Sequence, residues 1–133
     1  MFKVNKDDKT IHCTRGDIGL LEVGKSDLES GEPNLFYPGD TVRFKLTKKN
    51  DCNDVILQKD YIVTSEKEIV SIVFSGQDTK IGPVINKPVN YWSELELNPD
   101  TAPETLIGYD DVGAKIFRLY PEGGDFKGVD VNE

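Results

Sequence analysis

Few side chains in this sequence have both the type and the spacing that catalysis or metal binding requires. His12 is the only histidine among 133 residues, and no serine, cysteine or carboxylate stands at a catalytic-dyad spacing from it. Zinc binding is equally unsupported, because neither a second histidine nor a Cys-x-x-Cys pair is present. The sequence therefore predicts a protein that is not an enzyme, with no catalytic residue, no metal site and no cofactor.

Two groups of carboxylates are the remaining candidates for chemistry. The first offers oxygen ligands of the kind that calcium takes from loops, although its spacing departs from the D-x-D-x-D-G loop. Its members are Asp110, Asp111, Glu122 and Asp125. Glu94 and Glu96 form the second group, about 7 Å apart on one strand face, whereas a glycosidase pair flanks a cleft from different elements. We expect both groups to be solvated acidic surface.

Arg15, Gly16 and Asp17 spell the integrin-binding tripeptide. That function requires a secreted protein with the tripeptide on a loop tip, and nothing else in the sequence supports it. We predict instead a turn between two strands, with Arg15 and Asp17 facing each other or solvent.

The composition indicates one acidic, polar domain. The length suits a single domain with a real core, and 37% of the residues are hydrophobic and 30% charged. The formal charge of −8 argues against binding bare nucleic acid. No apolar run approaches the ~20 residues that cross a bilayer, and the N-terminus turns acidic where a signal peptide needs an apolar stretch. We expect synthesis in a cytoplasm, with neither nucleic acid nor membrane as partner.

Cys13 and Cys52 are the only cysteines in the sequence. Without a Cys-x-x-Cys pair, they are typical of buried or incidental thiols in a reducing compartment. A single disulfide between them remains an alternative.

Alternation of apolar and polar residues predicts short β-strands along the chain. The clearest runs from residue 41 to 49, with one buried face and one wet face. The predicted strands are 2–5, 10–14, 18–23, 41–49, 55–63, 68–75, 91–97, 104–109 and 114–120. With turn signals between them and no long amphipathic helix, these strands predict an all-β sandwich over residues 1–125, followed by a short acidic tail at 126–133.

Three local features refine this prediction. Lys59 and Asp60 interrupt the 55–63 strand and suggest a bulge or bend. Residues 76–82 have room for one helical turn. The last three strands read as a β-meander, with Gly113 supplying the positive φ of a tight hairpin between the final two.

Four segments carry a resemblance to a known family. They are Thr14–Asp17, Tyr37–Phe44, Ser75–Thr79 and Tyr91–Leu97. Together they resemble the immunoglobulin-like N-terminal domain of phage baseplate upper proteins and phage head-fibre proteins. Two closing segments, Thr105–Asp111 and Leu119–Gly123, look like a variant found in small virion proteins of Clostridium-type phages and prophages. The resemblance covers almost the whole chain and implies an immunoglobulin-like antiparallel β-sandwich.

The resemblance implies a structural role in a phage virion, after synthesis in the cytoplasm of the bacterial host. In the family, this domain fastens a longer fibre or receptor-binding region to the particle, whereas only nine residues follow Gly124 here. We therefore expect a capsid decoration protein that binds the major capsid protein. The alternative is a baseplate or tail adaptor that binds baseplate or tail proteins. Because like charges discourage self-association, we expect a monomer or a weak trimer in isolation.

The docking surface is expected in a region of aromatic and basic residues, because these types contribute most of the binding energy at interfaces. Phe36 and Tyr37 precede the 41–49 strand, while Arg43 and Lys45 lie on its wet face. Trp92 completes the set if it is exposed. Arg43 and Lys45 are expected to point to water and to meet an acidic partner without repulsion.

Trp92 leaves two alternatives open. By alternation it shares a face with Glu94 and Glu96, where a tryptophan is uncommon unless a partner docks there. It could equally cover the edge of the sandwich or pack under the Pro83–Pro88 crossing. A second function also uses it: a carbohydrate- or receptor-binding module, in which Trp92 and the tyrosines form a stacking platform.

Overall fold

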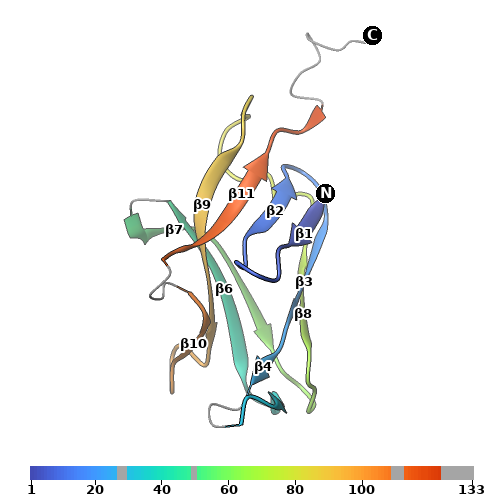
Figure 1. Cartoon of the computed structure of the whole chain (residues 1–133), viewed down its shortest axis with the longest axis vertical. Coiled ribbons are helices and arrows are strands. Elements are labelled where there is room, and N and C mark those ends of the chain that lie inside the picture. The colour runs from blue at the N-terminus through green and yellow to red at the C-terminus, as the bar shows by residue number, and fades with distance from the viewer. Residues whose placement is uncertain (27–29, 49–50, 109–112, 124–133) are drawn as a thin grey trace.

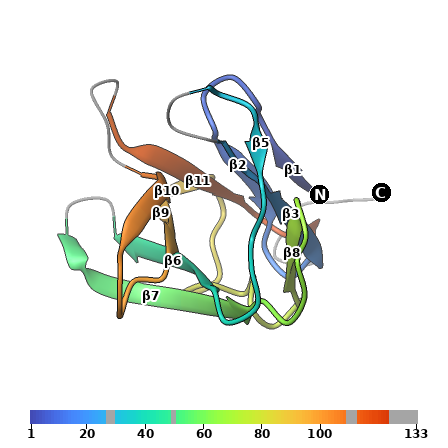
Figure 2. The ribbon, with the colours of Figure 1, turned by 90° about the horizontal axis from the view of Figure 1, so that it is seen from below.

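The computed structural model describes residues 1–26, 30–48, 51–108 and 113–123, apart from the side chains of residues 51–53. Over these ranges the protein is an all-β sandwich, consistent with an immunoglobulin-like fold, as the sequence predicts (Figures 1 and 2). The eleven strands found there are β1 (Phe2–Val4), β2 (Ile11–Thr14), β3 (Gly19–Val23), β4 (Lys25–Ser26), β5 (Pro33–Asn34), β6 (Thr41–Lys48), β7 (Asp51–Ile62), β8 (Val70–Phe74), β9 (Val89–Leu97), β10 (Glu104–Ile107) and β11 (Lys115–Tyr120). Nine correspond to predicted strands, and the short β4 and β5 lie between the predicted strands 18–23 and 41–49. The predicted tail lies outside the described residues.

The large sheet has the strand order β1-β2-β11-β9-β6-β7, with β10 also paired to β9 (Figure 1). Neighbouring strands are antiparallel except β2 and β11, which run parallel and are far apart in the sequence. The opposing layer is small: β3 pairs with β8, and β4 pairs with β5. The large sheet therefore supplies most of the framework on which surface residues are placed.

Strand β9 lies at the centre of the large sheet. Along one edge it pairs with β6 through residues 91–97. Along the opposite edge it pairs with β11 through residues 89–93 and with β10 through residues 95–97. Both β10 and β11 run antiparallel to β9, so they lie in line along one edge and do not form a hairpin with each other.

The predicted meander is therefore wrong in its last step. Strand β9 is long enough to hold both partners, and each hydrogen-bonds to it rather than to the other. Gly113 does have a positive φ of 128°, but residues 109–112 of the expected hairpin lie outside the described residues.

Four phenylalanines join the two layers. Phe74 of β8 contacts Phe44 of β6 edge to face, with ring centroids 5.1 Å apart. Phe2 of β1 stacks on Phe74 at 5.3 Å, and Phe117 of β11 lies 6.4 Å from both Phe2 and Phe44. Phe44, Phe74 and Phe117 are fully buried. Aromatic pairs at these separations contribute beyond the area that they bury, so this phenylalanine quartet is the main link between the sheets.

The long edge strand β7 departs from the prediction in two ways. It begins at Asp51, before the predicted start at residue 55. Its register against β6 shifts between Leu57 and Val55 and again between Val55 and Asp51, rather than at Lys59 and Asp60. Lys59 instead faces inward opposite Phe44, and its Nζ lies 2.8 Å from the Asp78 carboxylate. An inward charge and a bulge both protect an exposed sheet edge from pairing with other chains.

Residues 75–80 form a hydrogen-bonded turn, with no helix assigned in this stretch. Asp78 Oδ2 accepts hydrogen bonds from the Ser75 backbone N–H and from Lys59, both at 2.8 Å. These bonds, the Lys59 bond first, lower the pKa of Asp78.

Replacing Phe74 tests the role of the quartet. Phe74→Ala removes the only member that comes from the small sheet, so we expect a loss of about 3–5 kcal/mol in the free energy of unfolding. Urea denaturation followed by circular dichroism measures it. Phe74→Leu retains most of the volume and should cost clearly less. Equal, small losses in both variants would show that the layers are held by other contacts.

Candidate functional site

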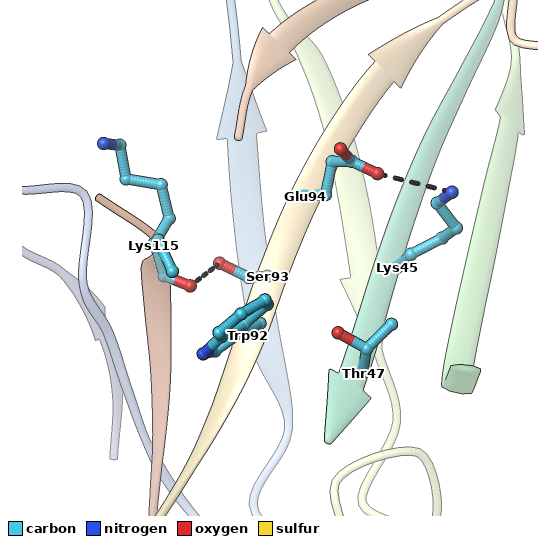
Figure 3. Close-up of a pocket in the computed structure, with 7 residues that line it drawn as sticks. Lys45, Thr47, Trp92, Ser93, Glu94 and Lys115 are labelled. Carbon is cyan, nitrogen blue, oxygen red and sulfur yellow. Dashed lines mark hydrogen bonds and ion pairs between the residues drawn. The ribbon is translucent and has the colours of Figure 1, made fainter. Parts of the chain in front are cut away.

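A shallow concavity of about 310 Å³ lies on the outer face of the large sheet, across β6, β9 and β11. Trp92 lines its floor, with Thr47 and Lys45 on the β6 side and Lys115 on the β11 side (Figure 3). Glu94, Ser93 and Ala114 complete the lining. Alternation explains the placement of Trp92 and Glu94, which point outward because Leu95 and Leu97 of the same strand point into the core.

Trp92 is partly exposed and lies in this concavity, next to Thr47 across the strand pair. The Pro83–Pro88 crossing contributes no residue to the lining of this concavity. An aromatic ring in a surface hollow can hold an apolar or ring-shaped group of a ligand.

The two cations predicted to face water are held by carboxylates of their own sheet. Lys45 Nζ lies 3.0 Å from Glu96 and 3.3 Å from Glu94. These contacts, the Glu96 bond first, raise the pKa of Lys45. The cross-strand register causes the pairing, because Lys45 stands directly opposite Glu94.

Arg43 is held more tightly than Lys45. Its Nε and one terminal nitrogen each donate to Asp60 at 2.9 Å, and that nitrogen also contacts Asp100 at 3.2 Å. The bidentate bond from Arg43 lowers the pKa of Asp60. Arg43 and Lys45 therefore lie on the outer face of β6, as alternation predicts, but both are partly buried and paired with carboxylates of the protein itself.

Phe36 is also misplaced by the sequence prediction. Its side chain is fully buried in the core, and its backbone pairs with Lys67 in an isolated bridge. A docking role for Phe36 is excluded in this conformation. Tyr37 is 47% exposed, as expected, but it precedes β6, whereas Trp92 pairs with Thr47 near the other end of that strand. The structure does not bring the five predicted docking residues into one surface.

No tyrosine among the described residues lines the concavity with Trp92, and Tyr109 lies outside the described residues. Tyr120 bonds to His12, and Tyr61 lies beside Lys67. Tyr91 alternates with Trp92 on β9, and burial raises its pKa. Among the described residues, Trp92 is therefore the one aromatic ring that lines the concavity.

Sequence reasoning missed the β11 side of this surface. Ile116, Arg118 and Tyr120 alternate with the buried Phe117 and Leu119 and point to the outer face. The alternation was visible in the sequence. Alternation does not show which strand pairs with β11, and Ile116 lies beside Trp92 only because β11 pairs with β9.

The Arg15-Gly16-Asp17 tripeptide forms the predicted turn, but Arg15 faces neither Asp17 nor solvent. Arg15 is buried and donates to the Gly82 carbonyl at 3.1 Å and to Glu122 at 3.4 Å. Asp17 pairs with the N-terminal amine of the chain. A buried arginine cannot present the tripeptide to a receptor, so it has a structural role.

The remaining candidates for chemistry have structural explanations. His12 Nδ1 and the Tyr120 hydroxyl are 2.8 Å apart. Burial raises the pKa of the Cys13 thiol to about 11, so that it is protonated at neutral pH, while the Cys52 side chain is outside the described residues. Among the described residues no cluster of potential metal ligands occurs, and Asp110, Asp111 and Asp125 of the calcium hypothesis lie beyond them.

Comparison with known proteins identifies no relative. No protein-family model, no curated protein and no solved structure matches the chain. In the part of the chain that the structure describes, no helix is long and apolar enough to span a membrane.

Reversing the charges of Arg43 and Lys45 tests how these cations act. Arg43→Glu with Lys45→Glu would place new carboxylates beside Asp60 and Glu94, so we expect the protein to lose about 1–2 kcal/mol of stability. Chemical denaturation measures the loss. The charge-matched pair Lys80→Glu with Lys87→Glu, at exposed positions, should change stability less. An unchanged midpoint in the first double variant would mean that the two cations are in fact uncompensated.

Proposed function

We propose that this protein is a non-enzymatic structural component of a phage virion. Its leading form is a capsid decoration protein that binds the major capsid protein, and the alternative is an adaptor bound to baseplate or tail proteins. The observation that carries the proposal is that the four segments of the family resemblance coincide with the turns and the central strand that fix this sandwich.

Two of these segments are bonded to each other. Thr79 Oγ1 accepts a hydrogen bond from the Gly16 backbone N–H at 3.0 Å and donates to the Asp17 carbonyl at 2.7 Å. Gly16 has a φ of 91°, and its carbonyl lies 2.7 Å from the point where a Cβ on Gly76 would stand. Thr79, Gly16 and Gly76 are therefore required together for this contact between two turns. Their joint occurrence in a sequence is a stronger sign of the same fold than the occurrence of either turn alone.

The third segment is a closed turn before β6. Asp40 Oδ2 accepts from the Tyr37 backbone N–H at 2.9 Å, and the Asp40 N–H donates to the Tyr37 carbonyl at 3.0 Å. Gly39 between them has a φ of 94°, which favours glycine. The fourth segment is most of β9, the strand at the centre of the large sheet. The resemblance implies the same framework for the family, and this supports the proposed role as a docking domain.

The concavity at Trp92 is the best candidate for the contact with the particle. It is on the wet face of the large sheet, its ring is accessible, and tryptophan is among the residues most enriched at binding hot spots. The Phe36 and Arg43 positions are not suitable, because one is buried and the other is neutralised.

Removing the ring tests this contact. Trp92→Ala should lower the occupancy of the protein on purified particles at least about tenfold, the size expected of a hot-spot residue. The protein should stay folded, because Trp92 lies outside the core cluster. Quantitative mass spectrometry of particles grown with each variant measures the occupancy, with Tyr37→Ala as the matched aromatic control.

Two outcomes would count against the proposal. Absence of the wild-type protein from intact particles would refute the virion role itself. Equal occupancy of Trp92→Ala and wild type would place the docking surface elsewhere on the domain.

A carbohydrate-binding module is the second candidate function. The same concavity favours it, because an aromatic ring beside carboxylate, hydroxyl and ammonium groups suits the apolar face and hydroxyls of a sugar. Glycan-array binding that is lost in Trp92→Ala would support this function, and a negative array would remove it.

A further inference from the structure

A row of basic side chains crosses the outer face of the large sheet beside the Trp92 concavity. Lys3 of β1 stands opposite His12 of β2, and His12 stands opposite Arg118 of β11. All three alternate with residues that pack in the core, so they share the outer face. Arg118 in turn stands opposite Asn90 of β9, one alternation from Trp92.

Neutral groups hold this row in place. Arg118 donates to the Asn90 side-chain carbonyl at 3.0 Å, and its guanidinium lies 5.7 Å from the centre of the Tyr120 ring. The Tyr120 hydroxyl is bonded to His12. The guanidinium is therefore positioned without losing its charge to a carboxylate, and a positioned charge loses less entropy on binding.

On the rest of this face, the cations are paired with carboxylates. Arg43 and Lys45 are paired with carboxylates, and Lys48 lies 3.3 Å from Asp54. Among the described residues, no carboxylate lies within ion-pair distance of Lys3 or Arg118. Asp8 interacts with His12 through space, although its own hydrogen bond is to the Thr10 backbone N–H. A protein with a net charge of −8 thus has a local cationic strip.

Aromatic and apolar side chains continue the strip. Ile116 of β11 stands opposite Trp92 of β9, which lines the concavity. Arg118 and Tyr120 follow Ile116 on the same face of β11, so Ile116 lies between them and the concavity. Tryptophan, tyrosine and arginine are the three types most enriched at interface hot spots. We call the surface formed by Lys3, His12, Asn90, Trp92, Ile116, Arg118 and Tyr120 the basic–aromatic face.

We infer that the basic–aromatic face binds an acidic, extended polypeptide segment of a partner protein. Carboxylates of the segment would meet Lys3 and Arg118, and an apolar side chain would enter the concavity at Trp92, next to Ile116. Charge complementarity selects an acidic partner. A long nucleic acid is disfavoured, because phosphate affinity needs many clustered lysines and arginines and the protein has a net charge of −8. This inference rests on the proposed docking role and specifies the chemistry of the partner.

Trp92 provides the measurement, because it is the only tryptophan and its fluorescence reports directly on this face. We would titrate the full chain with a synthetic 12-residue peptide that alternates glutamate and leucine. The same peptide with lysine in place of glutamate, a single-stranded DNA oligonucleotide and phosphatidylserine vesicles are the other arms. We expect saturable binding of the glutamate peptide alone.

Single variants assign the binding to the strip. Arg118→Gln, which keeps a hydrogen-bonding side chain beside Asn90, should weaken the glutamate peptide at least about tenfold. Lys3→Glu should weaken it in the same direction. Lys80→Glu, the same charge change at an exposed turn residue, should alter the affinity much less. Circular dichroism checks that each variant is folded.

Several results would overturn the inference. They are no binding of the glutamate peptide, equal binding of the lysine peptide, stronger binding of DNA or vesicles, and unchanged affinity in Arg118→Gln. The failure of the virion role is distinguishable, because absence of the protein from particles would leave peptide binding by the isolated chain intact.

Discussion

The contact of Phe74 with Phe44 and Phe2 is the interaction on which the rest of the structure depends. The layer formed by β3 and β8 has only two paired strands, and an isolated two-stranded sheet is marginal in water. Its stability must come from packing on the large sheet, and the phenylalanine quartet is where the largest side chains meet. Because this packing uses the inner face of the large sheet, the outer face carries no share of the core and can be used for recognition.

The outer face is divided by its electrostatics. Towards β6 and β7, cross-strand register puts each cation beside a carboxylate, which gives a neutral, self-satisfied surface. Towards β1, β2 and β11, the cations are held by an amide and an aromatic ring instead. Trp92 lies at the boundary between these halves. A partner that carries acidic and apolar groups can bind the half at β1, β2 and β11 without competing with the ion pairs of the half at β6 and β7.

Much of the fold follows from side-chain alternation in the sequence. All nine predicted strands exist, and the inward faces of segments such as 41–48 and 91–97 were assigned correctly. Alternation determines which way a residue faces but not which strand lies beside it. The pairing of both β10 and β11 with β9 therefore could not be read from the sequence, and neither could the carboxylate partners of Arg43 and Lys45, which depend on register between distant strands.

The candidate site was predicted in part for the same reasons. Trp92 was found because an aromatic residue among glutamates on a wet strand face is unusual. Phe36 was misplaced because it lies in a short segment before a proline turn, where no alternation shows its burial. Arg118 and Tyr120 were missed because their significance depends on their neighbours Asn90 and His12, which come from two other strands.

Hydroxyl-radical footprinting of the protein on purified particles, compared with the free protein, tests the central claim most directly. We predict that Trp92 and Tyr120 become protected on the particle, while Tyr37, which is exposed at the opposite end of β6, keeps its reactivity. Both readings come from one sample, so differences in occupancy or folding cannot imitate the pattern. Protection of Tyr37 with unchanged reactivity at Trp92 and Tyr120 would contradict the account and place the docking surface at the other end of the sandwich.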